Sequence, residues 1–429
     1  MEAKLTMMEA TKKMKADSYK MAALSIDVRN AILLAVREAL LKNRDAIFAA
    51  NKKDMDAAEQ NGIAASVKKR LKFDEHKLAD VTAGIDQLVS LADPIGKTLL
   101  ARQLDEGLNL YRVSCPIGVI GIIFEARPDA LVQISSLCIK SGNCAVLKGG
   151  KETANTNKIL FDIIYEAAVK TGAPEGCMLQ AEGHSEIDEL LACNKSVDLL
   201  IPRGSNAFVQ YIMNNTKIPV MGHADGICHT YIDRDADIEK AAKILLDAKT
   251  QYTAACNATE TLLLDREKAS VMLPVLAERL REGGVKIRGT KEVTDMIGGE
   301  VMGEDDFATE YLDMVISIKL VSGVDEAIAH INTFGSHHTD CIITENAQTA
   351  EKFMNLVDSA GVYQNASTRF ADGFRYGFGA EVGISTSKIH ARGPVGLEGL
   401  TTYKYKLYGD GHIVGDYAEG RKQFHHKDL

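Results

Sequence analysis

The strongest constraint on this chain is a repeated alternation between short apolar segments and longer amphipathic ones. Short apolar segments bounded by polar turns are typical of buried strands, whereas an apolar period of about 3.6 residues is typical of helices. The strands expected first are 117–124, 144–147, 177–180, 197–201 and 218–220, and the helices between them are 129–140, 153–171, 185–192 and 205–213. Strands that are apolar on both faces and separated by helices predict a doubly wound parallel sheet.

The alternation begins again after Gly226 and predicts a second α/β unit. Its expected strands are 228–232, 259–264, 314–319, 341–344 and 361–364, and its expected helices are 235–248, 266–282, 324–331 and 347–358. The fold class is therefore α/β with two sheet-containing units.

The flanking segments have different patterns. In the first hundred residues Ile32, Leu33 and Val36 recur near a helical period, which predicts amphipathic helices, with a surface helix at the N-terminus. Segments 99–104 and 108–113 lie on either side of a Gly-containing connection and predict a β-hairpin. The tail at 401–417, rich in Gly and Tyr, predicts an extended arm.

Composition excludes several function classes. There are 50 Lys and Arg against 59 Asp and Glu, so the formal charge of -9 argues against a nucleic-acid binder. The longest apolar stretch is far shorter than the roughly 20 residues needed to cross a bilayer, and the N-terminus lacks the apolar core of a signal peptide. The eight Cys form no CxxC pair, which favours reduced thiols in the cytoplasm over disulfides or a zinc ribbon.

Two loops are candidates for binding a phosphate, although the usual G-x-G-x-x-G fingerprint of dinucleotide sites is absent. Lys148 and Lys151 follow a predicted strand, where ligands dock on open α/β sheets. Gly204 and Ser205 also follow a strand and open a helix, so free N–H groups and a Ser cap would face an anion. The alternatives are a solvated lysine loop and an ordinary helix cap.

Cys256 is the candidate nucleophile. It lies in a small, polar loop immediately before a predicted strand, whereas the other seven Cys lie in or beside apolar strands and helices. An exposed thiol surrounded by backbone N–H groups is where nucleophilic reactivity is expected. An inert thiol is the alternative.

Several spaced motifs then agree in their order along the chain. They are PIGVIG at 116–121, FEARP at 124–128, SGN at 141–143, LKGGKE at 147–152 and CNATET at 256–261. Together they resemble the gamma-glutamyl phosphate reductases, the proline-biosynthesis branch of the aldehyde dehydrogenase superfamily. The resemblance extends from the N-terminal helices to the Gly- and Tyr-rich tail.

The resemblance implies NADPH-dependent reduction of L-glutamate 5-phosphate to L-glutamate 5-semialdehyde with release of phosphate. Cys256 would attack the acyl phosphate and form a thioester, and hydride transfer would then give a thiohemiacetal that collapses to the aldehyde. The backbone N–H of Cys256 and the Asn257 side chain would be the oxyanion donors. Two other interpretations stay open: a semialdehyde dehydrogenase that oxidises to the free acid, and a catalytically silent binding subunit.

The resemblance also implies a domain division. Residues 1–97 and 116–226 would form the NADPH-binding domain, and 227–390 the catalytic domain, with the segment near 361–390 returning to the nucleotide domain as an open alternative. Residues 98–115 and 391–429 would form an oligomerisation hairpin and arm, so a homo-oligomer is expected. A glutamate 5-kinase is a possible partner.

Departures from the wider superfamily sharpen the site. His223 stands where hydrolytic relatives carry a water-activating Glu, and it would meet the leaving phosphate or protonate the product, or be purely structural. Ala126 stands where relatives have an oxyanion-binding Asn. Arg127 would bind the acyl phosphate or the substrate carboxylate, unless it only occupies a surface turn. Lys151 replaces an acid of NAD-preferring relatives and would attract the 2′-phosphate of NADPH, and Glu310 would position the nicotinamide ribose.

The remaining candidates are substrate contacts. His338 lies in a segment that the resemblance places near the substrate, with structural and metal-binding roles as alternatives, although adjacent His residues on a strand point apart. Asn365 and Arg369 would hold the glutamyl amino and carboxylate groups. No resident metal is expected.

Overall fold

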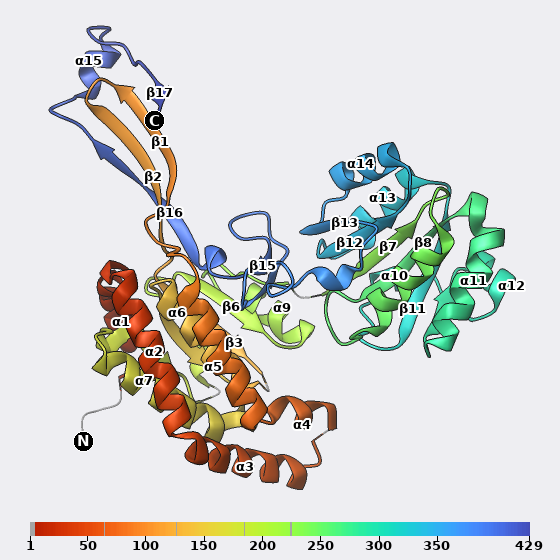
Figure 1. The fold of residues 1–429 in the computed structure, drawn as a ribbon, viewed down its shortest axis with the longest axis horizontal. Coiled ribbons are helices and arrows are strands. Elements are labelled where there is room, and N and C mark those ends of the chain that lie inside the picture. The colour runs from red at the N-terminus through yellow and green to blue at the C-terminus, as the bar shows by residue number, and fades with distance from the viewer. Residues whose placement is uncertain (1–4, 64, 126, 184, 224) are drawn as a thin grey trace. The chain divides into compact units, whose positions relative to one another are not determined.

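The computed structural model describes residues 5–63, 65–125, 127–183, 185–223 and 225–429. The chain forms two compact units, and each is described by itself (Figure 1). Unit 1 comprises Met1–Met221, Phe378–Gly383 and Val395–Leu429. Unit 2 comprises Gly222–Gly377 and Ile384–Pro394. Ala126, the predicted counterpart of an oxyanion-binding Asn, lies outside the described residues.

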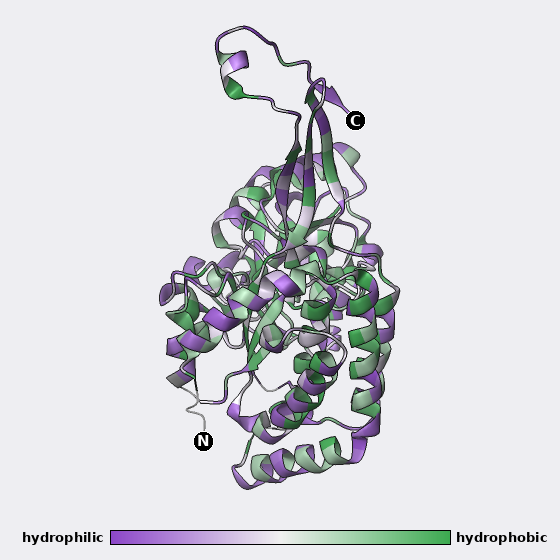
Figure 2. Cartoon of the chain, turned by 90° about the vertical axis from the view of Figure 1, so that its left-hand side faces the viewer, coloured by the Kyte–Doolittle hydropathy of each residue, from purple (hydrophilic) through white to green (hydrophobic). Residues whose placement is uncertain are grey.

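Unit 1 begins with helices, as the apolar period predicts. They are α1 (Met7–Ala23), α2 (Ile26–Lys42), α3 (Arg44–Gln60), α4 (Ala65–Leu71) and α5 (Glu75–Ser90). The apolar stripe Ile32, Leu33, Val36 and Leu40 is fully buried along one face of α2. Figure 2 shows the resulting mixture of hydrophobic and hydrophilic stretches along these helices. The N-terminal helix α1 is amphipathic, because Met14 and Met21 are 2% and 0% exposed while Met8 and Tyr19 are 51% and 68% exposed.

The first sheet is parallel and has the order β5-β4-β3-β6. Its strands are β3 (Val119–Phe124), β4 (Cys144–Lys148), β5 (Met178–Gln180) and β6 (Leu199–Arg203), connected by α6 (Pro128–Lys140), α7 (Ala154–Lys170) and α8 (Ser185–Leu191), and followed by α9 (Asn206–Asn214). The predicted strand at 218–220 is reduced to a single parallel bridge between Leu200 and Val220. The chain runs outward from β3 to β5 and then returns to place β6 on the other side of β3, so the strand order reverses at β3.

A separate antiparallel sheet has the order β16-β2-β1-β17. The predicted hairpin is β1 (Thr98–Asp105) and β2 (Leu108–Pro116), and the tail adds β16 (Thr401–Tyr408), α15 (Val414–Ala418) and β17 (Lys427–Asp428). The short strands β14 (Gly383–Ser385) and β15 (Gly393–Val395) pair with each other. The hairpin and the extended arm are thus confirmed as structure, while their role in oligomerisation stays a prediction.

Unit 2 contains a parallel sheet with the order β10-β9-β11-β8-β7-β12-β13. Its strands are β7 (Cys228–Ile232), β8 (Thr259–Asp265), β9 (Lys286–Gly289), β10 (Glu300–Val301), β11 (Val315–Val321), β12 (Thr339–Ile343) and β13 (Gly361–Gln364). Its helices are α10 (Ile238–Thr250), α11 (Ala269–Glu282), α12 (Lys291–Ile297), α13 (Val324–Phe334) and α14 (Ala347–Leu356). Leu262, Leu264 and Ile318 from the strands pack with Leu273 and Leu276 from α11 to form the main core.

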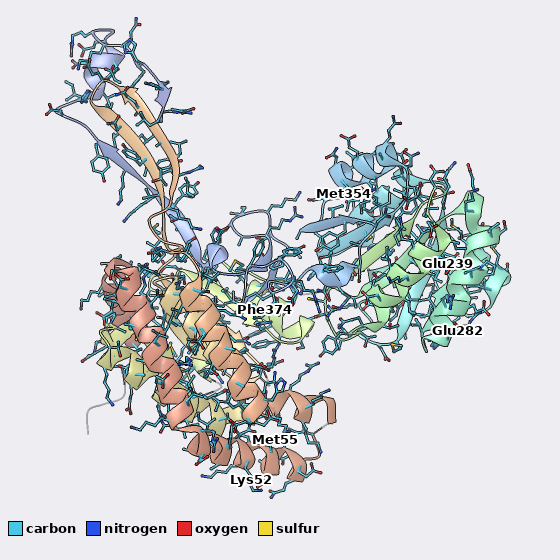
Figure 3. The ribbon with its side chains drawn as sticks, in the orientation of Figure 1. Lys52, Met55, Glu239, Glu282, Met354 and Phe374 are labelled. Atoms are coloured by element: carbon cyan, nitrogen blue, oxygen red, sulfur yellow. The ribbon has the colours of Figure 1, made fainter. Side chains whose placement is uncertain are left out.

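The surface side chains follow from the same amphipathic pattern. Lys52 on α3, Glu239 on α10 and Glu282 at the end of α11 are exposed (Figure 3). Among the described residues, no helix combines the length and the apolar character that a membrane crossing needs.

Candidate active site

Cys256 lies in the loop that connects α10 to β8, and its side chain is half-buried. The deeply buried thiols have a different character, because burial raises the pKa of Cys138, Cys177 and Cys341 to about 12. These three are protonated and unreactive at neutral pH. The geometry therefore favours Cys256 over them as the nucleophile.

His338 is the partner of Cys256. Its Nε2 lies 3.2 Å from Cys256 Sγ, and its Nδ1 lies 2.9 Å from Thr339 Oγ1. The order β8-β7-β12 explains this contact, because Cys256 precedes β8, His338 precedes β12, and the amino ends of parallel strands share one edge of the sheet. A thiol within hydrogen-bond reach of an imidazole, itself oriented by a third group, is the usual arrangement of an activated nucleophile.

His223 adjoins this pair. Its Nδ1 is 2.7 Å from the Ile384 carbonyl oxygen, and its ring lies edge-on to the ring of His338 with 4.8 Å between centroids. One ligand atom from each of His223, Cys256 and His338 lies within 4.8 Å of the other two. The structure thus groups two predicted substrate contacts around the predicted nucleophile.

Two residues that sequence reasoning missed hold the backbone of Cys256. The Cys228 thiol donates a hydrogen bond to the Cys256 carbonyl at 3.2 Å. A Cβ atom on Gly226 would lie 2.5 Å from Cys256 Cα and closer still to the carbonyl oxygen. The position of Gly226 in a Gly-containing motif before β7 was the available signal, since a glycine there permits close backbone approach.

Asn257 is placed differently from its predicted role as an oxyanion donor. It is 4% exposed, and its amide nitrogen donates to the Ala371 carbonyl oxygen at 2.8 Å. Its Oδ1 is buried and has no hydrogen-bond partner within the described part of the chain. The side chain therefore anchors the loop, and the backbone N–H of Cys256 is left as the candidate oxyanion donor.

Arg369 lies against the loop that carries Cys256. It is 8% exposed, its Nε donates to Gln251 Oε1 at 3.0 Å, and its guanidinium lies over the Tyr252 ring at 5.8 Å. Burial lowers the pKa of Arg369, and the nearby Cys256 thiol acts in the opposite direction. A buried guanidinium here can attract an anionic group.

Asn365 is also placed differently from its predicted substrate contact. Its Oδ1 accepts from the Thr344 N–H, and its amide nitrogen donates to the Thr344 carbonyl oxygen, each at 3.0 Å. The backbone of Asn365 has a φ of 52°, which Asn tolerates better than most residues. This side chain therefore closes the turn after β13.

A buried ion pair, which sequence reasoning also missed, joins the two ends of the Cys256 loop. Lys249 Nζ on α10 lies 2.6 Å from Glu260 Oε2 on β8, and both side chains are almost fully buried. Burial raises the pKa of Glu260 to about 7 despite the attraction of Lys249. Glu260 Oε1 also accepts from the N–H of Leu312, which holds the turn containing Glu310. A glutamate inside a predicted strand was the available signal.

The predicted nucleotide loops lie at the carboxyl edge of the first sheet, in unit 1. Lys148 is the last residue of β4 and is 6% exposed. Its ammonium donates to the Gly149 carbonyl oxygen at 2.7 Å, and burial lowers the pKa of Lys148. Gly204 and Ser205 follow β6, and Lys151 is exposed at the start of the short 3₁₀ helix Lys151–Thr153 after β4. Ser205 is the N-cap of α9, but within the described part of the chain its hydroxyl makes no capping hydrogen bond.

Arg127 follows β3 at this same edge. It is the N-cap residue of α6, and its Nη2 lies 3.2 Å from Asp129 Oδ2. Arg127 thus belongs to unit 1, whereas Cys256 belongs to unit 2.

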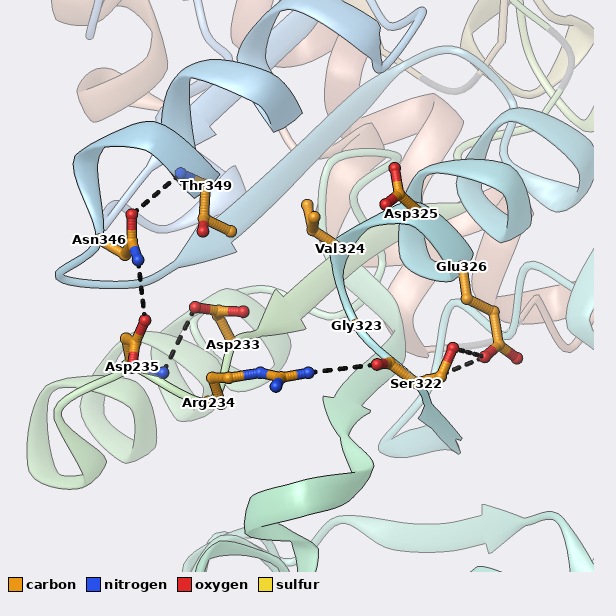
Figure 4. A pocket seen from close by; sticks show the side chains of 10 residues that line it. All are labelled: Asp233, Arg234, Asp235, Ser322, Gly323, Val324, Asp325, Glu326, Asn346 and Thr349. Atoms are coloured by element: carbon orange, nitrogen blue, oxygen red, sulfur yellow. Dashed lines mark hydrogen bonds between the residues drawn. The ribbon is translucent and has the colours of Figure 1, made fainter.

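Unit 2 also contains a cavity of about 330 Å³ at the carboxyl ends of β7, β11 and β12 (Figure 4). Arg234 donates to the Ser322 carbonyl oxygen, and Asn346 donates to Asp235. Cys256 precedes its strand and therefore lies at the opposite edge of the sheet. The cavity is distinct from the candidate active site.

Comparisons with known proteins agree with the geometry. The model of the aldehyde dehydrogenase family matches residues 2–297. The chain is 58% identical over 412 residues to a gamma-glutamyl phosphate reductase from Ruminiclostridium cellulolyticum, covering 96% of this chain and 95% of that protein. It is 54% identical to one from Acetivibrio thermocellus, covering 99% of each. A crystal structure of gamma-glutamyl phosphate reductase from Thermotoga maritima matches with a TM-score of 0.93 at 38% identity, covering 95% of this chain and 100% of that one.

Proposed function

This chain belongs to the gamma-glutamyl phosphate reductases of the aldehyde dehydrogenase family and is an oxidoreductase, and from that premise we propose how its residues perform the reaction. The substrate is L-glutamate 5-phosphate, the products are L-glutamate 5-semialdehyde and phosphate, and the reductant is NADPH. The observation that carries the proposal is the 3.2 Å contact between Cys256 Sγ and His338 Nε2. This contact gives a thiol the neighbouring base that covalent catalysis requires.

In the first step Cys256 is acylated. His338 Nε2 takes the thiol proton, and the thiolate attacks the acyl-phosphate carbonyl, so that a C–S bond forms and the C–O bond to phosphate breaks. The departing phosphate takes up one proton from solvent. The contact between His338 Nδ1 and Thr339 Oγ1 supports the ring orientation needed for this transfer. The backbone N–H of Cys256 stabilises the oxyanion, and the guanidinium of Arg369 attracts an anionic group of the substrate.

The cofactor supplies a hydride to the thioester carbon when it is bound. The resulting thiohemiacetal collapses to the aldehyde when the C–S bond breaks, and Cys256 leaves as a thiolate. The proton on His338 then returns to Cys256, which restores the starting state.

The residues of the first sheet fit a phosphate-bearing nucleotide. Lys148 places a buried ammonium at the end of β4, and α9 begins directly after Gly204 and Ser205 at the end of β6. These two loops lie at the carboxyl edge of the sheet, where open α/β sheets bind ligands. They follow β4 and β6, the strands on either side of β3, at which the strand order reverses. Lys151 would favour the 2′-phosphate of NADPH, and Glu310 would contact the nicotinamide ribose.

His223 stands at the position where hydrolytic relatives carry a water-activating Glu, and we propose that this replacement favours reduction of the thioester over its hydrolysis. The His223 imidazole is held beside the Cys256 thiol, because its Nδ1 faces the Ile384 carbonyl oxygen and its ring packs on His338. We propose that His223 attracts the leaving phosphate.

The reverse reaction tests this proposal. Glutamate semialdehyde, inorganic phosphate and NADP should together yield NADPH, and omission of phosphate should abolish the yield. Cys256→Ala should abolish turnover while retaining cofactor binding, and Cys115→Ala serves as the matched thiol control. Formation of NADPH without phosphate would contradict the non-hydrolytic mechanism.

The setting of the enzyme is proposed on the same basis. We propose a cytoplasmic enzyme of proline biosynthesis that receives its substrate from a glutamate 5-kinase. We also propose a homo-oligomer joined through the sheet of β1, β2 and β16, whose edge strand β16 exposes Tyr403, Tyr405 and Leu407. Sedimentation as a monomer would contradict the oligomer.

A further inference from the structure

We propose that Cys256, His338 and His223 together form an inhibitory binding site for one thiophilic divalent cation, with Zn²⁺ as the representative ion. One ligand atom from each of the three side chains lies within 4.8 Å of the other two. Tetrahedral Zn²⁺ bonded to sulfur at about 2.3 Å and to imidazole nitrogen at about 2.0 Å holds its ligand atoms roughly 3.5 Å apart. Small side-chain rotations therefore suffice to close the three ligands around the ion.

The orientation of the two imidazoles supports this site. His223 Nδ1 faces the Ile384 carbonyl oxygen, which can only accept, so Nδ1 is the nitrogen that donates there. His338 Nδ1 faces Thr339 Oγ1, and its Nε2 faces Cys256 Sγ. Metal-binding histidines characteristically donate one ring N–H to a carbonyl or another oxygen while the other nitrogen binds the metal.

The ligand chemistry determines which cations would bind. One thiolate and two imidazoles favour Zn²⁺, Co²⁺ and Cd²⁺ over Mg²⁺ and Ca²⁺, which prefer oxygen ligands. Binding replaces the S–H bond of Cys256 with an S–metal bond and releases one proton to solvent, so the affinity should rise with pH. The fourth coordination position stays open for water or a substrate oxygen.

Occupation of this site would block catalysis. The metal would hold the lone pairs of both the Cys256 thiolate and the His338 imidazole, and removal of the metal would restore them. The inhibitory consequence rests on the proposed function, whereas metal binding itself does not. The sequence pattern did not indicate this set of ligands, because the approach of His223 and Cys256 depends on the tertiary fold.

Titration with Co²⁺ tests the site directly. The full-length protein should bind one Co²⁺ with a thiolate-to-metal charge-transfer absorption, and Zn²⁺ should displace it while Mg²⁺ should not. Cys256→Ser should abolish this absorption, and His338→Ala and His223→Ala should each weaken Zn²⁺ binding by at least about tenfold. Thr339→Val should weaken it by about tenfold through loss of the oxygen that orients His338.

Matched variants separate this site from other histidines and thiols. His337→Ala and Cys115→Ser should leave Zn²⁺ affinity and the charge-transfer band unchanged. The same should hold for the double variant His425→Ala and His426→Ala, which removes the two adjacent histidines of the tail. A band that persists in Cys256→Ser, or that disappears in the tail variant, would overturn the proposal.

Activity measurements distinguish the two proposals. Zn²⁺ should inhibit the reverse reaction at the concentrations that displace Co²⁺, and a chelator should restore the rate. An inactive protein that still binds Co²⁺ through Cys256 would refute the proposed function and leave the metal site intact. An active enzyme that shows no Cys256-dependent Co²⁺ band would refute the metal site and leave the proposed function intact.

Discussion

At the scale of single residues, the proposed chemistry depends on the contact between Cys256 and His338. Replacement of His338 should therefore reduce activity without unfolding the protein. His338→Ala should lower kcat by roughly 10²–10⁴-fold, because a positioned base contributes about that much. Alkylation of Cys256 by iodoacetamide at neutral pH should slow in parallel. His337→Ala changes the neighbouring histidine and is the matched control. Unchanged alkylation of Cys256 in His338→Ala would contradict the role of His338 as its base.

Gly226 predicts a second effect at this scale, through backbone contact alone. In Gly226→Ala the new Cβ would overlap the backbone of Cys256. The loop must shift, so we expect a fall in kcat of about 100-fold, since misplacement by about 1 Å can cost that much. Gly84→Ala on α5 is the control, because a Cβ there meets nothing within 4 Å. Alanine should stabilise that helix by about 0.5–1 kcal/mol. Full activity in Gly226→Ala, assayed beside this control, would show that the close approach is unimportant.

At the scale of elements, the ion pair between Lys249 and Glu260 fixes the loop by joining α10 to β8. Glu260→Leu leaves the Lys249 charge buried without its partner and should lower the free energy of unfolding by about 3–5 kcal/mol. The double variant Lys249→Met with Glu260→Leu should recover most of this loss in urea denaturation. Failure of the double variant to recover stability would indicate that Glu260 acts mainly through its hydrogen bond to Leu312.

The packing of α13 predicts a dependence of stability on pH. His330 on α13 is 4% exposed, its ring packs on Phe307, and Lys319 and His229 lie near it. Burial lowers the pKa of His330 to about 3, below its ordinary value of 6.5. Between pH 6.5 and pH 3, His330 is therefore protonated in the unfolded chain but neutral in the folded protein. The free energy of unfolding should fall as pH falls through this range, by about 4–5 kcal/mol in total. His330→Phe should remove this part of the acid sensitivity in thermal unfolding at several pH values. An unchanged pH profile would contradict this assignment.

The elements also show what the sequence could and could not predict. Strands β8 and β11 were predictable because each contains a run of largely buried aliphatic residues, Leu262–Leu264 in β8 and Val315–Ile318 in β11 apart from Ser317. Strand β9 was missed because the exposed Lys286 and partly exposed Arg288 interrupt its apolar pattern. Cys256 could be singled out by its local environment. Its contact with His338 could not, because it joins residues 82 positions apart and depends on the order of β8, β7 and β12.

At the scale of the whole molecule, the chain binds anionic ligands although its own net charge is -9. Attraction must then come from a few placed cations, and the two units supply different ones. Unit 1 presents Lys148 and Lys151 at the carboxyl edge of its sheet, and unit 2 places the buried Arg369 against the loop that carries Cys256. Cofactor preference should therefore depend on local charge in unit 1 rather than on the total charge.

Reversal of the charge at Lys151 tests this separation. Lys151→Glu should lower kcat/KM for NADPH by about 10–100-fold, equivalent to about 1.4–2.8 kcal/mol, because a carboxylate would repel the 2′-phosphate. The same variant should leave kcat/KM for NADH nearly unchanged. The loss of kcat/KM for NADPH should become smaller at high salt, because salt screens the repulsion. Lys12→Glu on the exposed face of α1 alters the net charge by the same amount and should leave kcat/KM unchanged for both NADPH and NADH. Equal losses with NADPH and NADH in Lys151→Glu would mean that Lys151 supports the loop rather than reading the 2′-phosphate.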